Sequence, residues 1–241
     1  MRMPSCGVRM KSWRKNLRHI RRPQGKRKKL KSNMEKNDEV QVSAEFATSW
    51  KRALNAARKT VGKKRLDKEP SDGWKGWMLL AEHSPIRLVE YDLSFEKIRQ
   101  WVTVHIVRHW LGFIPFVHSQ RQDRRQLDCD RDNLPQGSLN DMDVAANAQA
   151  LINVSRKRLC SKASPETRTA WQRAKNAIGE IDPIMASKMV PNCIYRGFCP
   201  EHETCGYAYT EKFKKDLEEY RKECTELHKK QFEEQNKPIE S

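Results

Sequence analysis

The sequence predicts an α+β fold in which helices surround a small antiparallel sheet. Several segments place apolar residues at the spacing of amphipathic helices, whereas two short segments have the composition of strands. The chain of 241 residues is long enough to bury one sizeable core. Its basic N-terminus lacks the apolar segment of a secretory signal, and no apolar run approaches the roughly 20 residues that cross a membrane. We therefore expect one cytoplasmic domain that does not enter a membrane.

Positive charge is concentrated at the N-terminus. Residues 1–31 contain 13 Lys and Arg and no acidic residue, so they account for most of the net charge of +17. Such a segment is typical of a solvated, disordered tail, and it would also allow sequence-independent contact with nucleic acid. A third interpretation is that translation begins at Met34. We expect three parts: a basic tail over 1–38, a domain over 39–207 and a charged helix over 208–241.

The first half of the chain is expected to contain helices and one strand. Phe46, Trp50 and Leu54 lie at helical spacing, and Ser84-Pro85 is typical of a helix end. Partial alternation then predicts a strand, after which Ser94 can cap a helix. The expected elements are a helix over 43–62, a loop over 63–73, a helix over 74–81, a strand over 86–93 and a helix over 94–108.

The second half is expected to contain a short strand followed by helices. The segment over 113–117 is apolar around Pro115, which suits an edge strand. Ser164-Pro165 and Asp182-Pro183 place a capping side chain before a proline, which is typical of helix starts. In the last helix the apolar residues step by four and three; this spacing permits a coiled-coil seam, but packing against the domain is the preferred interpretation. The expected elements after the strand are a loop over 121–141 and helices over 142–158, from 164, over 182–190 and over 209–235.

Polar side chains that suit anions recur between residues 108 and 168. Arginine meets two oxygens of an anion at once, because its donors form a rigid fork. The clusters therefore predict a folded pocket for phosphorylated ligands. Taken alone, the first cluster also fits a solvated helix end, where cations complement the helix dipole. The clusters are Arg108-His109, Ser119-x-Arg121, Arg158 and Glu166-x-Arg168.

The order and spacing of these clusters resemble the motifs of the flavin-dependent thymidylate synthases, in particular their divergent phage-type members. Residues 108–110 (Arg-His-Trp) and 119–121 (Ser-Gln-Arg) are similar to the family's Arg-His-Arg and Ser-x-Arg. Arg158 lies 23 residues after Pro135 and opens a segment similar to the family pattern Arg-x4-Ala-x2-Glu-x-Arg. Upstream, residues 56–60 look like Ala-Ala-Arg-x-Ser. The resemblance covers roughly residues 50–170.

The resemblance implies a fold like that of the thymidylate-synthase-complementing proteins and reductive methylation of dUMP to dTMP. It implies FAD as the cofactor, NADPH and methylenetetrahydrofolate as co-substrates, and active sites shared between the subunits of a homotetramer. The residues that it assigns to FAD are Thr60, Arg108, His109 and Arg158. Those that it assigns to the pyrimidine nucleotide are His105, Ser119, Arg121 and Arg168, of which Ser119 and Arg121 would also be catalytic.

Several motif positions depart from the family pattern. Trp110 replaces an arginine that would hold flavin phosphate, and His105 replaces a glutamine. Residues 139–141 (Leu-Asn-Asp) stand where the family has Tyr-Thr-Arg, which removes a substrate-binding arginine. These departures leave two alternatives open. One is one-carbon transfer to another pyrimidine nucleotide, and the other is a nucleic-acid-binding protein with a Cys/His metal site and an inactive pocket.

A cysteine-rich segment lies outside the resemblance. The spacing Cys193-x5-Cys199-x2-His202-x2-Cys205 supplies four soft ligands within 13 residues, the number that a tetrahedral zinc site needs. Cys129 or Cys160 could also complete such a cluster. An iron–sulfur centre and ordinary reduced thiols are the alternatives.

Overall fold

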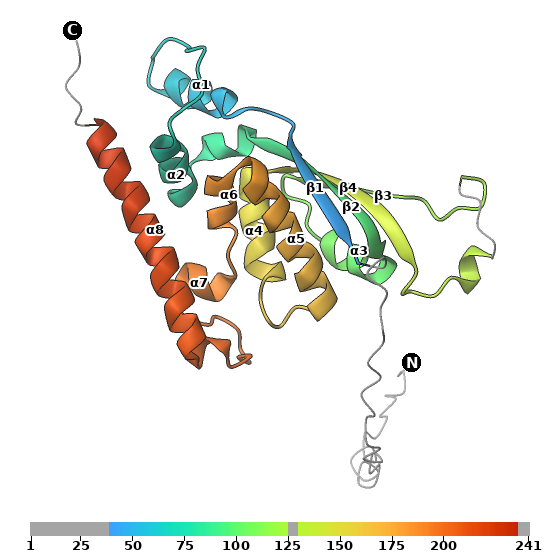
Figure 1. Ribbon diagram of the computed structural model, residues 1–241. Coiled ribbons are helices and arrows are strands. Elements are labelled where there is room, and N and C mark those ends of the chain that lie inside the picture. The colour runs from blue at the N-terminus through green and yellow to red at the C-terminus, as the bar shows by residue number, and fades with distance from the viewer. Residues whose placement is uncertain (1–38, 125–129, 236–241) are drawn as a thin grey trace, which may run out of the picture. The chain divides into compact units, whose positions relative to one another are not determined.

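The computed structural model describes residues 39–124 and 130–235, and the predicted tail over 1–38 lies outside them. The strands of the described residues form a four-stranded antiparallel sheet in the order β1-β2-β4-β3, which confirms the predicted α+β class. Helices α4, α5 and α6 lie on one side of this sheet (Figure 1). The strands are β1 (Gln41–Phe46), β2 (Glu90–Arg99), β3 (Phe113–Val117) and β4 (Leu139–Asn147). The helices are α1 (Trp50–Thr60), α2 (Asp72–Leu80), α3 (Gln100–Ile106), α4 (Ala148–Arg158), α5 (Pro165–Ile181), α6 (Pro183–Lys188), α7 (Asn192–Arg196) and α8 (Glu211–Gln235).

The segment expected to open the helix over 43–62 belongs to strand β1 instead. Strand β1 pairs along its whole length with β2, and Phe46 lies opposite Tyr91. Helix α1 begins only at Trp50. The prediction was wrong here because local spacing carries no information about the strand that a segment will meet in the folded chain.

Strand β2 is longer than expected, and Ser94 lies inside it rather than at a helix N-terminus. Ser94 pairs with Ser43 on one side and with Asp143 on the other. Leu93 and Phe95, on the opposite face of the strand, are buried. This period of two is that of a strand with one face in the core. Helix α3 follows only after β2 has ended.

Residues 142–147, which were expected in a helix, form the second part of strand β4. Met142, Val144 and Ala146 are buried and lie two residues apart, so this segment also has the period of a strand. The rest of the predicted helix is α4, which ends at Arg158 as expected.

The predicted edge strand and the two proline-marked helix starts are confirmed. Among the described residues, β3 pairs with β4 alone, so Pro115 lies on an edge strand. The Ser164 side chain accepts a hydrogen bond from the N–H of Thr167 at the start of α5. The Asp182 side chain accepts one from the N–H of Met185 at the start of α6.

The predicted C-terminal helix is α8. It packs against the rest of the domain, which was the preferred interpretation of its apolar spacing. Phe213 and Leu227 are its buried apolar residues. Leu227 lies against Gly76 of α2, where a Cβ would stand 2.5 Å from Leu227 Cδ2. The absence of a side chain at Gly76 therefore allows α2 and α8 to approach closely, and Figure 1 shows the two helices side by side.

The main core lies between the sheet and the helices α4 and α5. The rings of Phe95 on β2 and Trp171 on α5 stack with their centroids 6.4 Å apart. The indole N–H of Trp171 donates to Ser155 Oγ at 2.9 Å, so the polar atom of this buried ring is satisfied. The ring contact fixes α5 against the sheet, and the hydrogen bond fixes it against α4.

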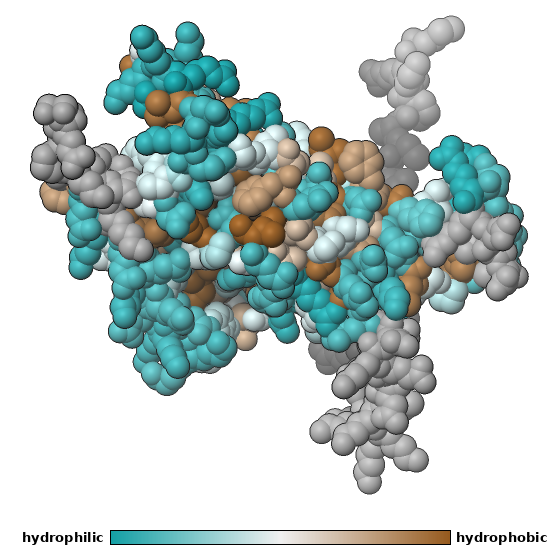
Figure 2. All heavy atoms as spheres, turned by 45° about the horizontal axis from the view of Figure 1, so that its top comes forward, coloured by the Kyte–Doolittle hydropathy of each residue, from teal (hydrophilic) through white to brown (hydrophobic). Residues whose placement is uncertain are grey.

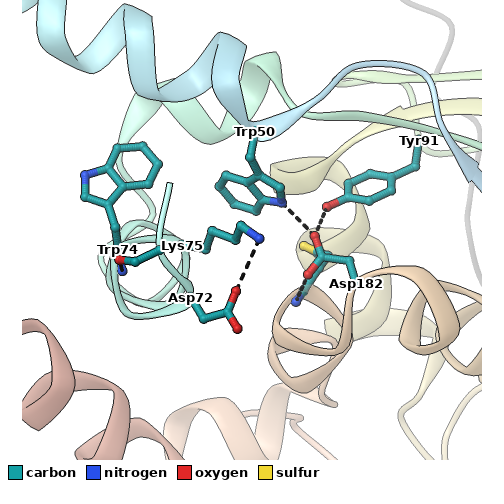
Figure 3. Close-up of polar contacts among 8 residues, drawn as sticks. Trp50, Asp72, Trp74, Lys75, Tyr91 and Asp182 are labelled. Atoms are coloured by element: carbon teal, nitrogen blue, oxygen red, sulfur yellow. Dashed lines mark hydrogen bonds and ion pairs between the residues drawn. The ribbon is translucent and has the colours of Figure 1, made fainter. Parts of the chain in front are cut away.

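A buried carboxylate joins the sheet to two helices (Figure 3). Asp182 is 4 % exposed, and its Oδ2 accepts from Trp50 Nε1 at 2.7 Å and from the Tyr91 hydroxyl at 2.8 Å. Its Oδ1 accepts from the N–H of Met185 at 3.0 Å. Burial, and then the adjacent Asp182 charge, raise the pKa of Tyr91 well above its ordinary value. The phenol therefore stays protonated as a donor to this carboxylate.

Hydrophilic side chains predominate on the face drawn in Figure 2, and apolar ones form smaller patches between them. Within the described part of the chain, no helix is both long and apolar enough to span a bilayer. This finding agrees with the absence of a long apolar run in the sequence.

Replacing the buried carboxylate tests its role in stability. In Asp182→Asn, the amide oxygen can take the place of Oδ2 and accept from Trp50 and Tyr91. The amide NH2 group then takes the place of Oδ1, so its donors face the N–H donor of Met185. We expect the free energy of unfolding to fall by about 2–4 kcal/mol, measured by urea titration followed by circular dichroism.

The matched control is Asp67→Asn. The Asp67 side chain is 95 % exposed and pairs with Lys51 at the surface, so we expect no measurable change in the free energy of unfolding. Equal effects of the two substitutions would contradict the role of Asp182.

Candidate anion-binding site

A cluster of basic side chains lies where α3 and α4 end and α5 begins. Arg158, the last residue of α4, donates from Nε to His109 Nε2 at 2.9 Å. Its Nη2 also donates to the carbonyl oxygen of His105 on α3. Two donors of the Arg158 guanidinium are thus bound by His105 and His109, at the end of α3 and just after it. These two hydrogen bonds hold Arg158 in a defined orientation.

The start of α5 joins this cluster through a chain of hydroxyl groups. His105 Nδ1 lies 2.9 Å from Thr167 Oγ1. The Ser164 hydroxyl donates to the same Thr167 oxygen at 2.7 Å while it caps the helix. Thr167 is fully buried, so this contact places the N-terminus of a 17-residue helix beside His105. The positive end of such a helix's dipole favours an anion nearby.

The histidines of the cluster are neutral at neutral pH. Burial, and then the charge of Arg158, lower the pKa of His109 to about 4. Burial, followed by the charges of Arg158 and Arg108, also lowers the pKa of His105. His109 can therefore accept the hydrogen bond of Arg158, because a neutral imidazole keeps one ring nitrogen unprotonated.

The arginines of the cluster lack a compensating acid. The pKa of Arg158 is lowered by burial and then by the charge of Arg108, so the two guanidinium groups lie near one another. Within the described ranges, no carboxylate forms an ion pair with Arg108, Arg158 or Arg168. Arg168 belongs to the first turn of α5, next to Thr167, and is half-buried. The arrangement offers positive charge and oriented donors to an anionic ligand.

The structure brings together five of the residues that the resemblance assigns to cofactor or substrate. Arg108, His109, Arg158 and His105 interact directly or through their charges, and Arg168 lies at the same helix start. Sequence reasoning did not single out Thr167, which joins His105 to α5. Its position between Glu166 and Arg168, inside a motif, was the signal that could have found it.

Two predicted substrate residues do not belong to this basic cluster. Ser119 and Arg121 follow strand β3, and no hydrogen bond or ion pair among the described residues joins them to Arg158. Arg121 instead forms a two-pronged ion pair with Asp123, at 2.9 Å from Nε to Oδ1 and 2.7 Å from Nη2 to Oδ2. Both side chains of this pair are more than half exposed.

Thr60 also lies away from the basic cluster. It is the last residue of α1, and its hydroxyl donates to the carbonyl oxygen of Ala57 at 2.7 Å. Helix α1 follows β1 near the start of β2, whereas α3 follows the end of β2, so the two helices lie at opposite ends of that strand (Figure 1). Within one chain, Thr60 therefore does not share a site with Arg158.

The departures from the family pattern have structural consequences. Asn140 is buried in β4, and its amide nitrogen donates to Gln100 Oε1 at 2.8 Å and to the carbonyl oxygen of His118 at 3.0 Å. This side chain therefore supports the fold. Trp110 is 75 % exposed beside the basic cluster, where the family has a cation.

The predicted zinc ligands are not gathered as the sequence suggested. In the part of the chain that the structure describes, no three His, Cys, Asp or Glu side chains are grouped closely enough to hold a metal ion. Cys193 lies in helix α7. The other three, Cys199, His202 and Cys205, lie in the segment between α7 and the 3-10 helix η4 (Tyr207–Tyr209).

Comparison with solved structures identifies the fold. Thymidylate synthase X from Helicobacter pylori, solved with FAD and dUMP, superposes with a TM-score of 0.50 at 13 % identity, over 62 % of this chain and 99 % of that chain. The chain has the fold of thymidylate synthase X.

Two structures of the UMP/dUMP methylase PolB from Streptomyces cacaoi are also similar. The one bound with 5-Br dUMP has a TM-score of 0.49 at 13 % identity, over 66 % of this chain and 96 % of that chain. The one bound with 5-Br UMP has a TM-score of 0.43 at 12 % identity, over 61 % and 92 %. No model of a protein family and no curated protein matches the sequence.

Acidification should destabilise the cluster through His109. The unfolded chain protonates this ring near the ordinary pKa of 6.5, whereas the folded protein does so only near about 4. Between these values the unfolded state binds more protons, so stability rises with pH and is lost as the pH falls toward about 4. We expect His109→Gln to reduce this slope, measured as unfolding free energies from urea titrations across that pH range.

Glutamine at position 109 keeps an oxygen acceptor for Arg158 but does not titrate. The control is His228→Gln, which changes an exposed histidine on α8. If His109→Gln leaves the slope of unfolding free energy against pH unchanged, the His109 ring does not contribute to the pH dependence of stability.

Proposed function

We propose that the protein is a flavin-dependent, thymidylate-synthase-like methyltransferase that reductively methylates dUMP to dTMP. The co-substrates are methylenetetrahydrofolate, which donates the one-carbon unit, and NADPH, which is the reductant. The observation that carries the proposal is the cluster near the N-terminus of α5 in which neutral His109 orients Arg158 beside Arg108, while no carboxylate of the described residues pairs with either arginine. Both FAD and dUMP carry phosphate, the anion that such donors bind.

The residues of the cluster fit an FAD molecule. Arg108 is exposed and forms no hydrogen bond or ion pair among the described residues, so its donors are available to a ligand. Arg158 is oriented before any ligand arrives, which lowers the entropy lost on binding. Bound flavin supplies the redox and one-carbon chemistry, while the protein supplies placement and charge.

The pyrimidine nucleotide is assigned to Arg168, His105, Ser119 and Arg121. Arg168, in the first turn of α5, would hold its phosphate. Arg121 is assigned to lie against the pyrimidine and stabilise negative charge as the ring is activated. Leaving Asp123 costs Arg121 little, because an exposed ion pair contributes only about 0–1 kcal/mol.

Assembly would complete this site. Among the described residues, no hydrogen bond or ion pair joins Ser119 or Arg121 to the Arg158 cluster, and Thr60 lies at the other end of β2. We propose a homotetramer in which these residues come from a neighbouring copy. The same arrangement gives the exposed Trp110 a place beside a ligand or a subunit.

Replacing Arg158 tests the cofactor assignment. Arg158→Ala removes a charged donor fixed by two hydrogen bonds, so we expect FAD to bind about 10–100-fold more weakly. Lys157→Ala is the matched control, because Lys157 is the preceding residue of α4 and reaches away to Glu201. Flavin fluorescence titration measures both affinities, and equal losses would contradict the assignment.

Replacing Arg168 separates substrate from cofactor. Arg168→Ala should weaken dUMP binding about tenfold or more while FAD binding stays within about twofold, because Arg168 is assigned to the nucleotide alone. Isothermal titration calorimetry measures both ligands on the same preparation. An unchanged dUMP affinity would remove Arg168 from the substrate site.

The activity itself is tested with dUMP that carries tritium at C5 of uracil. Full-length protein with FAD, NADPH and methylenetetrahydrofolate should release tritium and form dTMP, and omission of the folate should abolish dTMP formation. The same assay with labelled UMP and dCMP tests the alternative pyrimidine substrates. Bound FAD without release of tritium from any of these nucleotides would overturn the proposal.

A further inference from the structure

One face of the sheet is open in the part of the chain that the structure describes. Helices α4, α5 and α6 lie on the other side (Figure 1). The open side has a hollow of about 520 Å³, and every residue that lines it belongs to one of the four strands. Along β2, Asp92 and Ser94 of this face alternate with buried Tyr91, Leu93 and Phe95.

Negative charge on this face is not compensated within the sheet. Glu45 of β1 lies directly opposite Asp92 of β2, and Asp143 of β4 pairs with Ser94, two residues further along β2. Like charges directly opposite one another on neighbouring strands repel. Within the described ranges, none of these three carboxylates forms an ion pair, and the hollow that they line contains no lysine or arginine.

The rest of this face adds further acids and one large apolar side chain. A second hollow is lined by Asp143 with Glu96 and Asp141, and by one cation, Lys97. Phe116 of β3 lines the first hollow and is 62 % exposed. The surface therefore suits a partner that is mainly cationic and carries some apolar side chains. We call it the acidic face, and its carboxylates are Glu45, Asp92, Glu96, Asp141 and Asp143.

One segment of this chain has that composition. Residues 1–31 contain 13 Lys and Arg and no acidic residue, and apolar residues such as Trp13 and Leu17 lie among them. Residues 32–40 connect the segment to β1, which is a strand of the acidic face. Nine residues span at most about 30 Å, whereas the four strands together are only about 15 Å wide. The segment can therefore reach every carboxylate of the face.

The point from which this connection leaves the sheet is fixed beside the first carboxylate. Arg173 of α5 donates to the carbonyl oxygen of Val40 and forms an ion pair with Glu39. The residue after Val40 pairs with Glu96. Further carboxylates follow from there at two-residue steps along the strands: Asp143 first, and then Asp92 with Glu45.

We propose that residues 1–31 bind to the acidic face of their own chain. Their lysines and arginines would neutralise the carboxylates and relieve the repulsion between Glu45 and Asp92, while their apolar residues would cover Phe116. Each exposed ion pair contributes little by itself. The short connection, however, gives the segment an effective concentration of about millimolar at the face, so several weak contacts are enough.

The contact would limit binding of this protein to nucleic acid. The lysines and arginines that would lie on the acidic face are the same ones that could meet phosphate groups. The acidic face would therefore shield the segment from sequence-independent contacts. This inference does not depend on the proposed enzymatic activity.

Zero-length crosslinking of the full-length protein tests the proposal. A carbodiimide joins a lysine amine to a carboxylate only where the two are in contact, and residues 1–31 contain six lysines. We expect crosslinks from these lysines to the acidic face. Their yield should fall about threefold or more in about 0.5 M NaCl, because salt screens exposed charges. Mass spectrometry of a mixture of isotopically light and heavy protein shows whether both crosslinked peptides come from one chain.

Two double variants of equal net charge give the assignment its specificity. Asp92→Asn with Asp143→Asn removes two exposed carboxylates of the acidic face, and Glu218→Gln with Glu226→Gln removes two exposed carboxylates of α8. The first variant should lower the yield of crosslinks to the remaining carboxylates of the face about threefold or more, and the second should leave it within about 1.5-fold. Circular dichroism shows whether each variant keeps its fold.

The same two variants measure the shielding of the segment. At low salt, Asp92→Asn with Asp143→Asn should bind a 20-base-pair DNA duplex about threefold more tightly than the α8 variant, measured by fluorescence anisotropy. Equal DNA affinities, crosslinks spread evenly over the acidic face and α8, absence of crosslinks to the face, or crosslinks that join a light to a heavy chain would each overturn the proposal.

Discussion

The position of helix α5 depends on the buried carboxylate of Asp182. This residue ends α5 and begins α6, and it accepts hydrogen bonds from Trp50 on α1 and Tyr91 on β2. A buried charge is costly unless every lone pair finds a donor, and here three donors from three elements do so. One end of α5 is therefore fixed to the sheet. The other end, about 25 Å away along 17 residues, carries the candidate site.

At that other end, positive charge is oriented without being neutralised. A carboxylate beside Arg158 would hold it more strongly, but it would also cancel the charge that an anion needs. Neutral His109 accepts the hydrogen bond of Arg158 and leaves the charge in place. The cost is that Arg108 and Arg158 repel each other in the folded protein. Such unrelieved repulsion is typical of functional sites, where a ligand provides the missing charge.

The C-terminal helix is attached by different means. Lys188 of α6 is buried beneath α8, with its ammonium 3.5 Å from Cys224 Sγ, 3.8 Å from Glu223 Oε1 and 5.2 Å from the centre of the Tyr220 ring. Leu227 packs on Gly76 further along. These contacts lie at and beyond the middle of α8, whereas its start rests on the small cluster around Phe213.

The sequence by itself determined the features that are local. Ser164-Pro165 and Asp182-Pro183 marked two helix starts correctly, because a capping side chain and a fixed proline φ act within one turn. Pro115 marked an edge strand, since proline cannot donate to a neighbour on both sides. The order and spacing of the Arg108, Ser119 and Arg158 motifs indicated the fold that the comparison with thymidylate synthase X then showed.

Only the tertiary structure decided the features that depend on distant partners. Residues 43–46 and 142–147 read as helix in isolation, yet they pair with β2, and pairing across the sheet outweighs local periodicity. The contact of Thr167 with His105 joins residues 62 positions apart. Motif order could suggest which arginines matter, but only the packing of α3, α4 and α5 decided which of them meet.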